Sequence, residues 1–171
     1  MAAPRAEAQF DAIARQHAAE LFRFAYWLAR ERRQAEDIVQ EALLRGWRAW
    51  PRMRDRAAMK AWLFSIVRNE FYRMRGSSAP RFESIDESGL ELADERASLF
   101  GLEVRDAIMA LPPAYAEPLA LQVLGGFSCA EIASLCGTTE GAVMTRLTRA
   151  RQALKRIVAP VAPQARKGGQ P

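Results

Sequence analysis

The chain has 171 residues, half of them hydrophobic, and a formal net charge of +5 with a sequence pI near 9.8. This length allows one medium domain or two small ones, and the basic balance favours a polyanionic partner. Two cysteines and one histidine cannot form a four-ligand zinc site or a catalytic cluster, so we expect no metal, no cofactor and no enzyme.

The charged side chains are unevenly distributed along the chain. Residues 1–75 contain 15 basic and 9 acidic side chains, a net charge of +6. Residues 76–98 contain 2 and 6, a net charge of −4, and residues 99–171 contain 8 and 5, a net charge of +3. Two basic blocks separated by an acidic strip indicate two nucleic-acid-facing modules on a tether.

Apolar residues recur three or four positions apart through most of the sequence, and β-branched residues are few. This pattern predicts an all-α protein. The first helix is expected over residues 6–30, the second over 34–50 and the third over 57–75. Pro51 ends the second helix, and the arginine-rich segment 52–56 follows it as a loop.

No signal peptide or membrane span is predicted. The first residues lack a basic segment followed by an apolar core, and the most apolar stretch, residues 21–29, is short and interrupted by Arg23. Sparse cysteine is typical of a reducing compartment. We therefore expect a soluble, cytoplasmic protein without membrane insertion.

The third predicted helix carries cations and aromatic rings on one face, at Lys60, Phe64, Arg68 and Tyr72, with Asn69 beside them. Cations that follow a phosphate backbone and rings that stack on bases are the usual elements of single-stranded nucleic-acid binding. A solvated basic face that shelters two rings explains the same pattern equally well. This helix alone does not decide between the two.

A break in the helical pattern follows the third helix. Residues 76–98 are rich in acids and include Pro80, which predicts a flexible acidic linker. Further helices are expected over residues 100–111 and 114–124. The tail, residues 159–171, is too poor in apolar side chains to fold and is expected to be disordered.

Residues 126–156 predict a helix-turn-helix. Ser128 and Glu131 form a Ser-x-x-Glu capping box that opens a short helix, and Gly137 ends it. The second helix has a basic outer face and an inner stripe formed by Val143, Leu147, Ala150 and Leu154. A basic second helix is typical of one that enters a DNA major groove, although an antiparallel helical hairpin with a solvated basic face has the same pattern.

The two basic modules together resemble an extracytoplasmic-function (ECF) sigma factor of the sigma-70 family. The N-terminal similarity lies in AEDIVQEALLRGWRAW (residues 35–50) and WLFSIVRNEFYRMR (residues 62–75), in the order and spacing of sigma region 2. The C-terminal similarity lies in ALPPAYAEPLAL (residues 110–121) and the helix-turn-helix, which is similar to sigma region 4.

The resemblance implies two small helical domains that bind core RNA polymerase and promoter DNA, direct transcription initiation and are controlled by an anti-sigma factor. The implied divisions are region 2 at residues 6–75, the linker at 76–98, region 4 at 99–158 and the tail at 159–171. The implied polymerase-binding residues are Asp37, Gln40 and Glu41. The candidates for the melted −10 element are Arg52, Arg54, Arg56, Lys60, Arg68, Asn69 and Tyr72. The candidates for the −35 duplex are Thr139, Glu140, Ala142, Thr145, Arg146 and Arg149.

One stretch departs from the family pattern. Residues 141–146 read Gly-Ala-Val-Met-Thr-Arg where the family usually resembles Gly-Thr-Val-Lys-Ser-Arg, so Ala142 and Met144 replace a hydroxyl and a cation. This difference leaves room for a sigma mimic that sequesters an anti-sigma factor without binding DNA. A helix-turn-helix repressor or activator is a second alternative, but it leaves residues 35–75 unexplained.

Overall fold

The computed structural model describes residues 3–79 and 104–158, and every regular element within these ranges is a helix. In chain order they are α1 (Ala3–Ala29), α2 (Arg32–Ala49), the short 3-10 helix η1 (Trp50–Arg52), α3 (Met59–Met74), α4 (Val104–Met109), α5 (Pro113–Gly125), α6 (Cys129–Cys136) and α7 (Glu140–Val158). The predicted all-α class is confirmed, with helix ends shifted by a few residues. The predicted disordered tail and nearly all of the predicted acidic linker lie outside the described residues.

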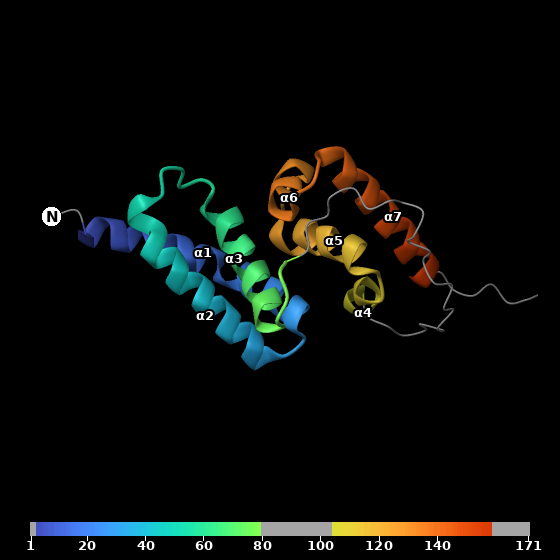
Figure 1. The fold of residues 1–171 in the computed structure, drawn as a ribbon, viewed down its shortest axis with the longest axis horizontal. Coiled ribbons are helices and arrows are strands. Elements are labelled where there is room, and N and C mark those ends of the chain that lie inside the picture. The colour runs from blue at the N-terminus through green and yellow to red at the C-terminus, as the bar shows by residue number, and fades with distance from the viewer. Residues whose placement is uncertain (1–2, 80–103, 159–171) are drawn as a thin grey trace, which may run out of the picture.

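Helices α1, α2 and α3 pack as a three-helix bundle (Figure 1). Its core contains Leu21 and Phe24 from α1, Ile38 from α2 and Leu63 from α3, all fully buried. Gly46 lets α2 approach α3 closely, because a Cβ at this position would lie 2.9 Å from Leu63 Cδ2. Burying each such large apolar side chain contributes roughly 1.5–3 kcal/mol to the stability of the fold. This burial fixes which side of α2 faces the core, and the opposite side faces solvent.

The loop between α2 and α3 is set by local backbone chemistry. Pro51 occupies the start of η1, where its missing N–H costs no helical hydrogen bond. Met53 then adopts an extended conformation, and the Asp55 Oδ1 accepts a hydrogen bond of 3.0 Å from the backbone N–H of Ala57. The arginines of segment 52–56 therefore lie in the loop at the end of the bundle, between α2 and α3.

The predicted helix-turn-helix is confirmed in α6 and α7. Ser128 Oγ accepts from the Glu131 backbone N–H at 3.3 Å, and Glu131 Oε2 accepts from the Ser128 N–H at 2.8 Å, which completes the capping box. Gly137 ends α6 in the left-handed region, at φ 63°. Thr139 Oγ1 then accepts from the Ala142 N–H at 3.2 Å and caps α7.

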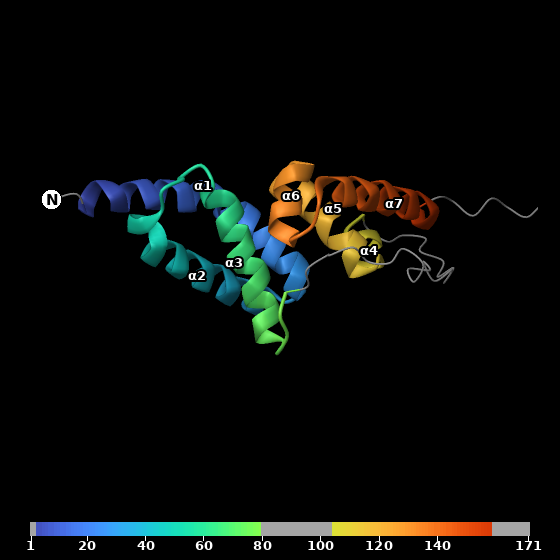
Figure 2. The same ribbon diagram turned by 45° about the horizontal axis from the view of Figure 1, so that its top comes forward.

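The N-terminal and C-terminal helices meet in one continuous apolar core. Helix α5 packs on α1 and α6 packs on α3, and both views show α6 beside α3 (Figures 1 and 2). At this junction the rings of Phe64 and Phe127 lie 4.8 Å apart, centroid to centroid, and nearly perpendicular at 85°. Across the described residues, the helices are too short or too polar to cross a membrane.

Candidate polymerase and nucleic-acid interfaces

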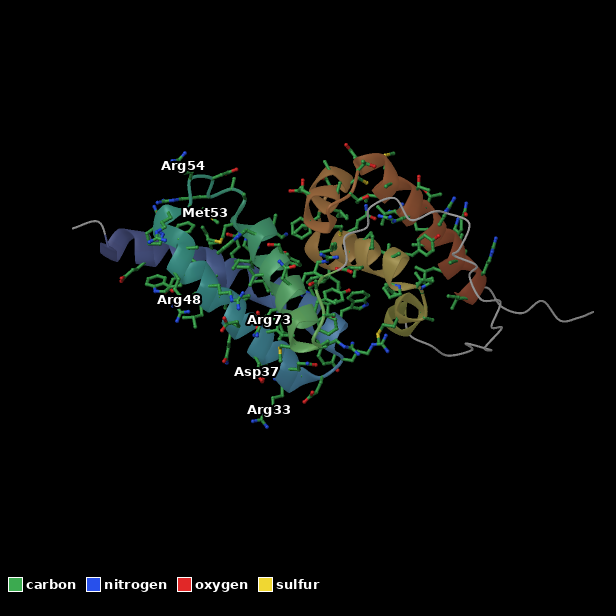
Figure 3. All side chains as sticks on the ribbon, viewed as in Figure 1. Arg33, Asp37, Arg48, Met53, Arg54 and Arg73 are labelled. Atoms are coloured by element: carbon green, nitrogen blue, oxygen red, sulfur yellow. The ribbon has the colours of Figure 1, made fainter. Side chains whose placement is uncertain are left out.

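The outer face of α2 is mostly polar, with Leu44 as an exposed apolar side chain among the charged and amide groups. Asp37 and Gln40 are exposed, and Asp37 lies with Arg33 along the outer edge of the helix (Figure 3). Glu41 is half-buried and accepts a hydrogen bond of 2.8 Å from Arg45 Nε one turn later. The structure therefore places the three predicted polymerase-binding residues on one side of α2, away from the bundle core.

Glu70, which was not predicted as a functional residue, forms ion pairs beneath this face of α2. Glu70 on α3 is buried and pairs with Arg45 Nη2 at 3.1 Å and with Arg73 of its own helix. The hydrogen bond from Arg73 lowers the pKa of Glu70, burial opposes this shift, and the charge of Arg45 adds to the lowering. Glu70 thus ties α2 to α3 by charge. The sequence signal was a lone acid within the basic segment 68–75.

The loop after α2 presents a group of cations to solvent. Arg52 and Arg54 are exposed, and Arg54 extends from the tip of the loop (Figure 3). The Arg56 guanidinium lies 4.7 Å from the ring centroid of Trp50, and its Nη1 donates to Gln9 Oε1 on α1. Such a basic loop is suited to phosphate contacts along a nucleic-acid strand.

The residues predicted on one face of α3 are only partly exposed: the sheltered ring agrees with the second interpretation, and the burial of the Arg68 cation agrees with neither. Asn69 is exposed, but Phe64 is completely buried and Arg68 is 4% exposed. Lys60 is half-buried and bonded to Glu20 Oε2 at 2.9 Å. The physical reason is that α5 and α6 cover this face, a contact that the periodicity of one helix cannot reveal.

The partner of Arg68 is Glu117, which sequence reasoning missed. Arg68 Nε donates to Glu117 Oε1, and the Tyr72 hydroxyl donates to Glu117 Oε2 at 3.1 Å. Glu117 is 1% exposed, and burial raises its pKa while Arg68 and Tyr72 oppose the rise. Burial, reinforced by the Glu117 charge, also raises the pKa of Tyr72. The available signal was that Glu117 is the one charged residue in α5.

The outer face of α7 is more open than that of α3. Glu140 and Thr145 are exposed, and Ala142 and Arg149 are half-buried. Arg146 differs from the expectation of an exposed cation: it is 7% exposed and its Nη1 donates to Thr138 Oγ1 at 3.5 Å. Burial lowers the pKa of Arg146.

Arg146 is buried because of its position on the helix. It lies three residues after Val143 and four before Ala150, so it shares the inner face of α7 with both. The neighbouring thiol of Cys136 is also buried, which raises its pKa to about 12 and makes it a poor nucleophile. A basic loop and a capped helix-turn-helix are typical of nucleic-acid-binding proteins, and the outer side of α2 is a further solvent-facing surface.

Comparison with known proteins agrees with this class. The sigma-70 region 2 family matches residues 13–79, and the sigma-70 region 4 family matches residues 101–154. The ECF RNA polymerase sigma factor SigL of Mycobacterium tuberculosis is 36% identical over 163 residues, covering 90% of this chain and 91% of that protein. SigM of the same species is 31% identical over 151 residues, covering 87% of this chain and 76% of that protein.

A solved structure is also similar. The sigma factor RpoE in complex with the anti-sigma factor NepR from Bartonella quintana is 28% identical, with a TM-score of 0.65, and the match covers 87% of this chain and 96% of that one. The chain belongs to the ECF RNA polymerase sigma factors of the sigma-70 family. It is a transcription initiation factor that acts with core RNA polymerase on promoter DNA, and it is not an enzyme.

Proposed function

We propose that the outer face of α2 is the surface that docks on core RNA polymerase, through Asp37, Gln40 and Glu41. The observation that carries the assignment is a solvent-facing side of α2 on which these three polar residues surround the exposed Leu44, while the opposite side is buried in the core. Arg45 of α2 pairs with Glu41 on this side and with the buried Glu70 of α3, so ion pairs join this side of α2 to α3. A preformed surface loses less conformational entropy on binding.

For the −10 element we propose a site formed by the basic loop and α3. The loop supplies phosphate contacts through Arg52, Arg54 and Arg56. Asn69 is exposed on α3 and is suited to hydrogen-bond an unpaired base. The remaining members of the site are Lys60, Arg68 and Tyr72.

For the −35 element we propose that α7 enters the major groove with its N-terminal half toward the bases. Thr139 caps the start of α7, Glu140, Ala142 and Thr145 lie in its first two turns, and Arg149 follows one turn later. Because Arg146 is buried, we assign it to holding α7 against the turn while the others contact DNA. Met144 is 56% exposed on the same outer face, where an apolar side chain is suited to a thymine methyl group.

We further propose domain limits of 6–75 for region 2 and 99–158 for region 4, with residues 76–98 as the tether between them. The protein acts in the cytoplasm beside the polymerase. An anti-sigma factor is the proposed regulator, supported by the similarity to a sigma factor solved with such a partner.

Run-off transcription with purified core polymerase tests the function directly. Promoters are selected from a genomic DNA library by transcription with the reconstituted holoenzyme, and the start sites are mapped. Initiation at a shared −10 and −35 sequence supports the proposal. A sigma mimic would give no transcript while still binding an anti-sigma protein, and a repressor would bind promoter duplex tightly without polymerase.

A further inference from the structure

The last arginine of the basic loop is held by residues outside the loop. The Arg56 guanidinium lies 4.7 Å from the ring centroid of Trp50 in η1, within the distance of a cation–π contact. Its Nη1 donates to Oε1 of Gln9, a residue of α1 that lies 47 positions earlier in the chain. The neighbouring Arg54 extends from the tip of the loop (Figure 3). Arg56 is thus positioned by its contacts with α1 and η1.

A buried aromatic group determines where this anchor lies. Trp50 is 2% exposed, and the Phe10 ring packs edge-on against it at 5.9 Å, centroid to centroid. Phe10 in turn lies close against α2, because a Cβ at Gly46 would be 3.1 Å from Phe10 Cε2. Phe10 directly follows Gln9 in α1, so the packing of Phe10 sets the position of the Gln9 backbone. The amide of Gln9 therefore reaches Arg56 from a turn of α1 that is fixed on the core.

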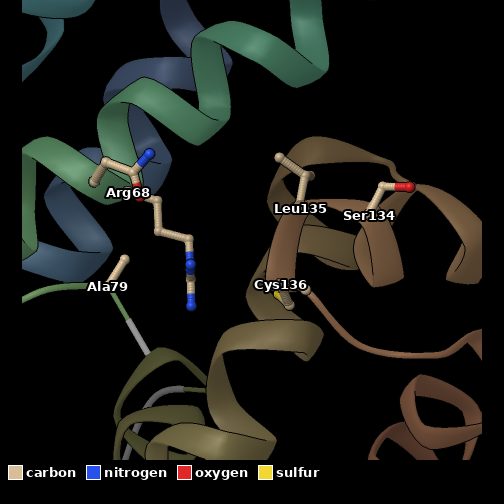
Figure 4. Close-up of a pocket in the computed structure, with 7 residues that line it drawn as sticks. Arg68, Ala79, Ser134, Leu135 and Cys136 are labelled. Atoms are coloured by element: carbon tan, nitrogen blue, oxygen red, sulfur yellow. The ribbon is translucent and has the colours of Figure 1, made fainter. Parts of the chain in front are cut away.

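The partners of Arg56 are neutral, which matters for an anionic ligand. Arg68, shown beside the end of α6 in Figure 4, is instead paired with the carboxylate of Glu117. A carboxylate partner offsets the charge of an arginine, whereas an amide oxygen and an indole ring leave it in place. A guanidinium has five N–H donors, and the bond to Gln9 uses one of them. Arg56 therefore keeps its charge and further donors for a phosphate.

We propose that Gln9 is a positioning residue for the −10 site. Its amide oxygen, together with the Trp50 ring, holds the Arg56 guanidinium so that the remaining N–H donors meet a phosphate of the melted strand. Gln9 acts through Arg56 and does not itself touch DNA. The sigma-70 region 2 match begins at residue 13, so Gln9 lies before the segment that the family match covers. This inference rests on the proposed assignment of the basic loop to the −10 element.

The first test is Gln9→Glu in the full-length chain, because it places a carboxylate where the amide bonds to Arg56. The holoenzyme is assembled with core polymerase. The probe is a fluorescent fragment of a selected promoter with a premelted −10 segment, and its binding is measured at several salt concentrations. The variant should bind about fivefold or more weakly. The slope of log affinity against log salt should fall in magnitude by about 0.7, the value for one phosphate contact on a single strand.

Gln9→Ala removes the amide without adding a charge. Arg56 then keeps its full charge but must be ordered when DNA binds. Affinity should therefore fall about two- to threefold, the cost of immobilising one long side chain, while the salt slope stays at its wild-type value. Wild-type affinity in both Gln9 variants would overturn the inference.

Arg56→Ala supplies the background that separates positioning from direct repulsion of DNA. If Gln9 acts through Arg56, Gln9→Glu should cause no further change in affinity or in salt slope once residue 56 is alanine. A carboxylate that repels DNA directly would weaken binding by the same factor in both backgrounds, and this result would overturn the inference.

Gln16→Glu is the matched control. It makes the same change at an exposed position on α1, about two turns beyond Gln9. Its affinity and salt slope should stay close to wild type, and circular dichroism should show unchanged helix content in both glutamate variants, because both positions are exposed. A loss in this control equal to that of Gln9→Glu would show that added negative charge on α1 is responsible, and would contradict the positioning role.

The single variants Arg54→Ala and Arg56→Ala separate this failure from failure of the proposed function. If they weaken binding to the premelted promoter while the Gln9 variants bind as wild type does, the loop assignment stands and only the role of Gln9 is wrong. If both arginine variants bind as wild type does, the loop is not part of the −10 site and the inference fails with it.

Discussion

The two DNA faces of the molecule differ in what covers them. On α3, Arg68 is buried and Tyr72 is bonded to Glu117, so the chain itself occupies part of the proposed −10 surface. On α7, Glu140 and Thr145 face solvent. The comparison teaches that the amphipathic pattern of a helix shows which side is not buried in the core of its own domain. The pattern does not show whether a second domain packs against that side.

The largest expected effect belongs to neither DNA face. Reversing charge at Asp37 and Glu41 together, to lysine, should abolish association with core polymerase and all promoter-specific transcription, because both lie on the outer side of α2. Helix content should be unchanged. Pull-down of core polymerase measures this, with Asp11→Lys on α1 as the control; retention of core by the double variant would show that the docking face is elsewhere.

The next effect concerns the −10 side of the comparison. Asn69→Ala should lower open-complex formation by about tenfold, which corresponds to ~1.4 kcal/mol, because one hydrogen-bonding contact to the melted strand is lost. Permanganate reactivity of unpaired thymines measures the melted strand. The defect should be smaller on a template with a premelted −10 segment, where strand separation is already complete. An equal defect on both templates would point to a role after melting.

On the −35 side, Arg146→Ala and Arg149→Ala should both reduce transcription initiation, but for different reasons. Arg146 is buried, so its loss should lower the thermal midpoint by several degrees, about 2–4 °C per kcal/mol for a chain of this size, together with −35 recognition. Arg149→Ala should reduce initiation about threefold or more with little change in midpoint. Calorimetry and transcription on promoters with altered −35 sequences distinguish the two. A stable Arg146→Ala protein that discriminates normally between −35 sequences would contradict the positioning role.

The smallest effect is a pH dependence within region 2. The pKa of Glu70 is lowered in the folded protein, so its ionised form favours folding. This contribution is present above the unfolded value near 4.3 and is lost as pH falls through the folded pKa. Urea unfolding from pH 6 to pH 3 should therefore lose less stability in Glu70→Gln than in the wild type. Parallel losses in the two proteins would show that the bond to Arg73 does not contribute.

Local features of the fold could be predicted because they depend on residues three or four positions apart. The Ser128–Glu131 capping box and the glycine end of α6 are of this kind, and both are present. The burial of Arg146 could also have been predicted from the sequence, since its spacing from Val143 and Ala150 places it on the inner face of α7. Its charge led to the opposite interpretation.

The contact between α3 and the C-terminal helices could not be predicted in the same way. Arg68 and Glu117 lie 49 residues apart in the chain and on different domains, so no periodicity connects them. The burial of Phe64 against Phe127 belongs to the same junction, and the sequence left open whether this ring is exposed or sheltered. Only the presence of a single charged residue in α5 gave a signal, and it did not identify the partner.

Footprinting of one promoter by the wild-type protein, with and without core polymerase, tests the central claim most directly. The protein alone should bind the duplex weakly and in a salt-sensitive way, with no protection or melting at −10, because part of the α3 face is covered. Addition of core polymerase should produce protection at both −35 and −10 together with unpaired thymines at −10. Tight, sequence-specific protection of both elements by the protein alone would contradict the account.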